Sequence, residues 1–91
     1  MYEMEKRHKE NEMKKMREKA NKKLLDIRNR CIMDVKKLGE KTSRDICLAT
    51  TEYEMDIIHK HFEEEINRIN ERQIRESEKV QQQFMKDLMS L

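Results

Sequence analysis

Uncharged residues recur along this chain at intervals of three, four and four positions. The first such series runs from position 13 to position 57 and contains no charged residue, although 44% of the chain is Asp, Glu, Lys or Arg. Its members are Met13, Met16, Ala20, Leu24, Ile27, Cys31, Val35, Leu38, Thr42, Ile46, Ala49, Tyr53 and Ile57. Because an unpaired charge is costly to bury, the pattern predicts a helix that buries one stripe against a partner helix.

A second series keeps the same rhythm but is shifted by one residue. Its members are Cys47, Thr51, Met55, Ile58, Phe62, Ile66, Ile69, Gln73, Ser77, Val80, Phe84, Leu88 and Leu91. The two series overlap between positions 46 and 58, where we expect the apolar face to widen. Eleven residues in three turns is about 3.67 residues per turn, so this hendecad repeat predicts a bundle that is nearly straight or weakly right-handed.

The sequence is compatible with two arrangements, a helical hairpin and one continuous helix. Gly39, followed by the capping-box pattern of Thr42 and Asp45, is typical of a break between two helices, which would give a helical hairpin with arms 13–38 and 42–91. The first series, however, crosses this stretch without losing phase, and one glycine inside a helix costs only about 1 kcal/mol. We therefore expect one continuous helix over residues 13–91, about 120 Å long. Residues 1–12, which are mostly charged, are expected to form a frayed or extended helical N-terminus.

Such a helix is not stable alone, so the sequence predicts an oligomer. Adjacent apolar pairs such as Leu24–Leu25 and Ile57–Ile58 broaden the stripe beyond what one neighbour covers. Residues 1–44 hold 15 Lys and Arg against 8 Asp and Glu, a net charge of +7, whereas residues 45–91 hold 6 against 11, a net charge of −5. This split favours antiparallel neighbours.

The predicted fold is therefore all-α, a coiled coil whose helices form a four-helix bundle containing antiparallel pairs. The expected partners are further copies of the chain, in a homotetramer, or a homologous coiled-coil chain. The expected core residues are Leu24, Ile27, Cys31, Val35, Leu38, Ile46, Ala49, Tyr53, Ile57, Ile58, Phe62, Ile66, Ile69, Val80, Phe84 and Leu88.

The sequence offers little chemistry beyond association. His59 and His61 point to different sides of a helix and have no third ligand at helical spacing, so no metal or other cofactor is expected. Without a phosphate-binding loop or a nucleophile motif, we expect neither an enzyme nor a small-molecule substrate. No membrane span is expected, and direct nucleic-acid contact through basic residues 6–23 is disfavoured because acids are mixed among them.

The last twelve residues, 80–91, form a Gln-rich helix that ends in the apolar sequence Leu-Met-Ser-Leu. This segment resembles the C-terminal coiled coils of the meiotic chromosome axis core proteins, which build the lateral elements of the synaptonemal complex. The resemblance implies a tetramer with antiparallel pairs of parallel helices, assembly into filaments and a nuclear location. A cytoskeletal or spindle tether in the cytoplasm is the alternative.

The two ends of the predicted rod carry apolar residues that are not required for packing between its helices. We expect these residues to join successive rods end to end, since exposed apolar patches tend to mark interaction sites. The candidates are Tyr2 and Met4 at one end and Met85, Met89 and Leu91 at the other.

Overall fold

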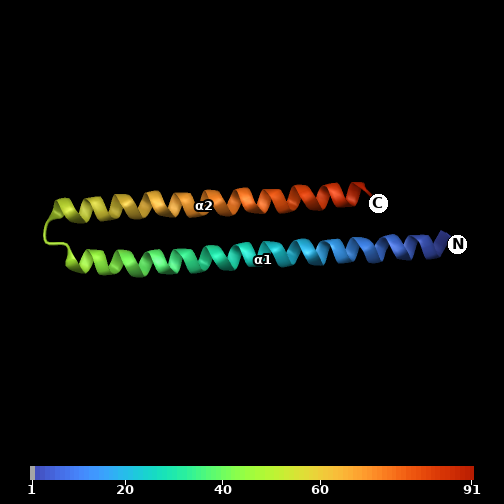
Figure 1. Cartoon of the computed structure of the whole chain (residues 1–91), viewed down its shortest axis with the longest axis horizontal. Helices are drawn as coiled ribbons and strands as arrows, with labels where there is room; N and C mark the ends of the chain where they lie inside the picture. The colour runs from blue at the N-terminus through green and yellow to red at the C-terminus, as the bar shows by residue number, and fades with distance from the viewer. Residues whose placement is uncertain (1) are drawn as a thin grey trace.

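The chain folds into a helical hairpin. The structure, a computed structural model, describes residues 2–91, and both secondary-structure elements in this range are α-helices. Helix α1 (Tyr2–Leu48) and helix α2 (Glu52–Met89) lie side by side and run in opposite directions, joined by residues 49–51 (Figure 1). The hairpin is a rod with extents of 76 × 17 × 9 Å.

The expected continuous helix over residues 13–91 is therefore wrong. The alternative of a helical hairpin is confirmed, but its turn lies at residues 49–51 and not at Gly39. Gly39 lies inside α1 without a positive φ, and Thr42 lies half-buried three residues later. The preserved phase across these positions correctly indicated helix. The Thr42–Asp45 pattern caps nothing because no helix begins there.

The turn at residues 49–51 is held by side chains that cap the start of α2. Thr51 has an extended backbone (φ −130°, ψ 155°), and its Oγ1 accepts a hydrogen bond from the N–H of Glu54 at 3.1 Å. Glu54 reaches back, and its Oε2 accepts a hydrogen bond from the N–H of Thr50 at 2.9 Å. This is a variant of the capping box, in which the acid binds the residue before the N-cap rather than the N-cap itself.

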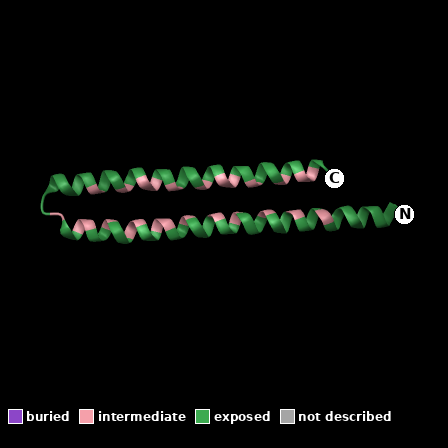
Figure 2. Ribbon diagram, in the orientation of Figure 1, coloured by how far each residue is buried: buried purple, intermediate pink, exposed green. Residues whose placement is uncertain are grey.

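The one-residue shift between the two apolar series marks this turn. From Met16 to Ile46 the first series supplies half-buried residues of α1, and from Ile58 to Leu88 the second series supplies those of α2. Figure 2 shows these half-buried positions along the facing sides of the two helices. We call this contact between the two stripes the seam.

The two helices differ in length, so their ends do not coincide. Helix α1 has 47 residues and α2 has 38, and the N-terminal part of α1 extends past the end of α2 (Figure 1). Residues 2–11 are all exposed and helical. They form an overhang with no neighbouring helix beside most of it.

Replacing Thr51 with Ala is expected to lower the free energy of unfolding by about 1 kcal/mol, because the first turn of α2 loses its side-chain acceptor. Denaturant titration followed by circular dichroism measures this change. Ser43→Ala, at an exposed position inside α1, is the control and should be neutral or slightly stabilising. Equal destabilisation by both variants would contradict the capping role of Thr51.

Candidate interaction surface

The seam holds most of the residues that the sequence assigned to a core, but it buries none of them. Among residues 2–91 no side chain is buried, and the seam residues are all half-buried. The predicted core residues found there are Leu24, Ile27, Cys31, Val35, Leu38, Ile46, Ile58, Phe62, Ile66, Ile69, Val80, Phe84 and Leu88. Ala49 is half-buried in the turn itself.

Tyr53 and Ile57 do not lie in the seam. Both belong to the first series, which ends its packing role at the turn, and they are 75% and 50% exposed. Leu48 is also exposed, and with Ala49, Ile57 and Ile58 it lines a shallow hollow beside the turn. Residues 46–58, where the sequence predicts a wider apolar face, thus contain the turn, and several of their apolar side chains are exposed to water.

One side of the hairpin is crossed by two ion pairs. Arg72 on α2 pairs with Asp34 on α1, and Arg30 on α1 pairs with Glu76 on α2 at 3.5 Å. We call the side that carries these four residues the ion-pair side. Each pair is partly exposed, so each contributes at most about 1 kcal/mol, but together they align the two helices.

Half-buried carboxylates border the seam at regular intervals. Asp34 and Asp45 on α1, and Glu65, Glu76 and Asp87 on α2, are each separated from the next on their helix by eleven residues. These acids belong to neither apolar series, so the periodicity of uncharged residues does not reveal them. Their eleven-residue spacing, which matches that of the apolar series, is the signal that would have found them.

The opposite side of the hairpin is apolar at the same level. Ile32 lies two residues from both Arg30 and Asp34, and Ile74 lies two residues from both Arg72 and Glu76. Two residues along a helix turn the side chain by about 200°, so both isoleucines lie on the side away from the ion pairs. They are 54% and 57% exposed.

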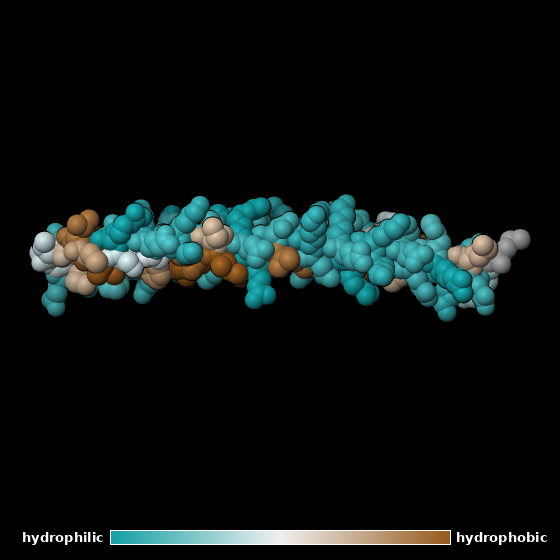
Figure 3. All heavy atoms as spheres, turned by 90° about the horizontal axis from the view of Figure 1, so that it is seen from below, coloured by the Kyte–Doolittle hydropathy of each residue, from teal (hydrophilic) through white to brown (hydrophobic). Residues whose placement is uncertain are grey.

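Two more exposed apolar residues share this side. Leu25 lies seven residues before Ile32, and Met85 lies eleven residues after Ile74, and both spacings keep a residue on the same face of a helix. We call the surface formed by Leu25, Ile32, Ile74 and Met85 the apolar side. Hydrophobic atoms also gather along one edge of the rod when it is viewed over α1 (Figure 3).

The residues expected at opposite tips of a rod lie at one end of the hairpin. Tyr2 and Met4 begin α1, while Met85, Met89 and Leu91 end the chain beside it (Figure 1). All five are exposed. This end, which we call the open end, replaces the two separate tips of a continuous helix, because the turn brings the start of α1 and the end of α2 to the same end of the rod.

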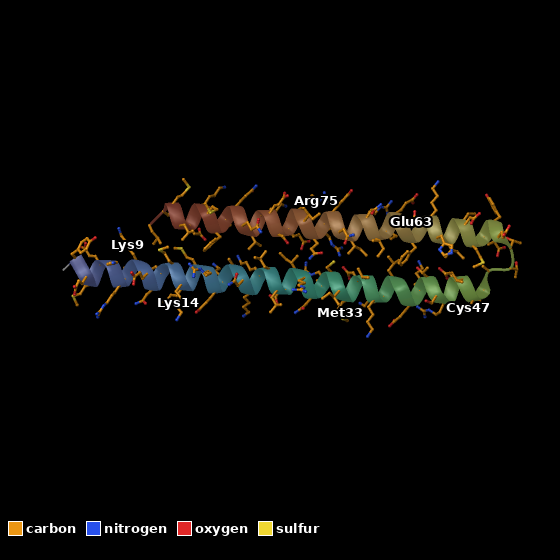
Figure 4. All side chains as sticks on the ribbon, turned by 180° about the vertical axis from the view of Figure 1, so that it is seen from behind. Lys9, Lys14, Met33, Cys47, Glu63 and Arg75 are labelled. Atoms are coloured by element: carbon orange, nitrogen blue, oxygen red, sulfur yellow. The ribbon has the colours of Figure 1, made fainter. Side chains whose placement is uncertain are left out.

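The rod is electrically polar along its length. The open end, counted as residues 2–25 and 80–91, holds 10 Lys and Arg against 6 Asp and Glu, a net charge of +4. The turn end, residues 40–66, holds 3 against 8, a net charge of −5. Figure 4 shows Lys9 and Lys14 near the open end and Cys47 and Glu63 toward the turn.

The remaining reactive side chains stay apart. Cys31 is half-buried in the seam and Cys47 is exposed, and both are free thiols. Within residues 2–91 no group of three or more His, Cys, Asp or Glu side chains is arranged to hold a metal ion. Neither described helix has a stretch long and apolar enough to cross a membrane.

A comparison of the chain with known protein families, characterised proteins and solved structures finds no match. The arrangement of the two helices and their surfaces is therefore the basis for assigning a function.

Replacing Ile66 in the seam with Glu is expected to lower the free energy of unfolding by roughly 2 kcal/mol, because a carboxylate is partly buried without a partner. Loss of helical circular dichroism and a lower melting temperature measure this effect. Met33→Glu is the matched control, since Met33 is 52% exposed on the side of α1 away from α2 (Figure 4). If Met33→Glu were as harmful as Ile66→Glu, the seam would not be the main stabilising contact.

Proposed function

We propose that this chain is a structural module that self-associates into a coiled-coil bundle and scaffolds larger assemblies. The carrying observation is that the hairpin lacks a core, since none of residues 2–91 is buried. Its accessible surface is 8025 Å², whereas a compact monomer of 11.2 kDa exposes about 5,700 Å². The excess of more than 2,000 Å² exceeds the roughly 800 Å² that each partner buries in a typical stable complex.

A four-helix bundle of this chain requires two hairpins. Within one hairpin, α1 carries a net charge of +6 and α2 a net charge of −4, so the antiparallel contact favoured by charge is already made inside the chain. Two hairpins then supply the four helices that the broad apolar stripe favours. A dimer of hairpins is therefore favoured over a tetramer of single helices. The eleven-residue spacing of the seam supports a nearly straight bundle.

End-to-end assembly follows from the two ends of the rod. The open end is basic and exposes Tyr2, Met4 and Met89, whereas the turn end is acidic and exposes Leu48 and Tyr53. Contact between unlike ends of successive rods joins opposite charges and covers apolar surface on both. Both tips of a pair of rods can make such a contact with the next pair, so the contact does not close on itself and extends into a filament.

The resemblance of residues 80–91 to meiotic chromosome axis proteins supports one setting for such a filament, as a nuclear scaffold along chromosomes. A cytoskeletal or spindle tether in the cytoplasm is the alternative setting. A second activity is favoured by one observation, the basic N-terminal part of α1. Residues 6–23 hold 9 Lys and Arg against 3 Glu, which suits contact with nucleic-acid phosphates.

The copy number is tested by multi-angle light scattering across a concentration series. The expected result is a particle of about 22 kDa, two chains of 11.2 kDa, with higher masses appearing as concentration rises. A mass near 45 kDa with a rod length near 120 Å would instead support four open helices. A monomer at all concentrations, in a helix-rich state, would contradict the proposed self-association.

Filament formation is expected in electron micrographs without nucleic acid, and the filaments should shorten as salt screens the charged ends. Met89→Glu, at an exposed position of the open end, should reduce filament length while leaving the two-chain particle intact. Met33→Glu serves as the control. If filaments form only when DNA is added, and the chain shifts DNA with an affinity that falls steeply with salt, the nucleic-acid function replaces the scaffold.

A further inference from the structure

We propose that two hairpins associate through the apolar side, with their rods antiparallel, so that Ile32 and Ile74 of both copies meet near the two-fold axis. This inference rests on the self-association proposed above and adds to it the surface and the orientation. The occupant of the apolar side is a second copy of this chain.

The two flanks of the hairpin are unequal, and that inequality selects the apolar side. The ion-pair side already contains two salt bridges across the seam, which join Arg72 to Asp34 and Arg30 to Glu76. Covering that side would remove water from these charges, which is costly. On the apolar side at the same level, Ile32 and Ile74 remain more than half exposed. Covering them removes apolar surface from water without enclosing an ion pair.

The position of these isoleucines suits a symmetric contact. The stretch in which α1 and α2 lie together runs from the turn to the end of α2 at Met89, and the two ion pairs that bracket Ile32 and Ile74 lie near its middle. An axis at this level lets two rods overlap along the whole paired stretch. The same patch then contacts itself, as a two-fold interface requires.

Charge selects the antiparallel orientation. In that orientation each basic open end, with its net charge of +4, lies beside the acidic turn end of the other copy, with its net charge of −5. Parallel rods would place like ends together at both tips. One local repulsion opposes the antiparallel orientation. Arg28 and Lys36 flank Ile32, and near the axis Arg28 of one copy would approach Lys36 of the other. The long side chains of Arg28 and Lys36 can move their charged groups into water. The net charge of each rod end is spread over many residues and cannot be moved away from the contact in this way.

The surface is tested by a pair of adjacent substitutions. Ile32→Glu places a carboxylate on the apolar side, and Met33→Glu places one on a neighbouring residue of nearly equal exposure that faces away from it. Sedimentation equilibrium should show at least a tenfold weaker association for Ile32→Glu and an unchanged one for Met33→Glu. Because both positions are exposed in the single hairpin, an effect of Ile32→Glu alone cannot come from the seam.

The orientation is tested by a distance. In a Cys31→Ser background, spin labels on Cys47 should be about 45 Å apart in antiparallel rods, because each lies about 15 residues from the axis. Parallel rods would bring the two labels within about 25 Å, and that distance would overturn the proposed orientation.

The outcomes separate this inference from the function on which it rests. A wild-type chain that stays monomeric overturns both. Association that is indifferent to Ile32→Glu, or equally weakened by Met33→Glu, overturns the apolar side as the interface and leaves self-association standing. Selective loss with Ile32→Glu, together with the long distance between the Cys47 labels, supports the surface and the orientation together.

Discussion

Everything in this hairpin depends on contact between two narrow apolar stripes. Two cylinders that lie side by side cover each other along one line, so water still reaches every residue of the seam from the flanks. The stabilisation is therefore spread over many half-buried side chains, each of which gives only part of the roughly 1.5–3 kcal/mol of a fully buried one. A fold of this kind gains stability with length and with added neighbours, and no single residue completes it.

The two flanks of the seam differ in their chemistry. Arg30, Asp34, Arg72 and Glu76 join the helices on one side, where their charges also keep water near. Two residues away on each helix, Ile32 and Ile74 occupy the other side without any partner in the chain. A short segment such as Arg30-Cys31-Ile32-Met33-Asp34 thus serves the ion-pair side, the seam, the apolar side and the outer surface in turn.

The helical character and most seam residues were predictable, because periodicity reports burial directly. From Leu24 to Ile46 and from Ile58 to Leu88 the two series identified every uncharged half-buried position except Gly39, and they missed the half-buried carboxylates. The turn was not predicted, since it lacks the glycine or proline that normally marks one and because Gly39 offered a stronger local signal. The informative features were the change of phase between the series and the Thr51–Glu54 pair. The prediction that Tyr53 and Ile57 belong to the core was wrong because the turn was not predicted. A series of uncharged residues describes one face of a helix and carries no information about where that helix ends.

The composition of the turn bears on how the two arms could be connected. Residues 49–51 contain no glycine or proline and no positive φ, so nothing in them forbids a continuous helix. If the turn became helical, Tyr53 and Ile57 would continue the apolar stripe of α1. Helix α2 of one chain could then pack against α1 of another chain. The same seam contacts then form between chains, as in a domain-swapped pair. Concentration during folding would then decide which connectivity forms, because the short turn holds the arms of one chain at a high effective concentration that only a concentrated solution can match.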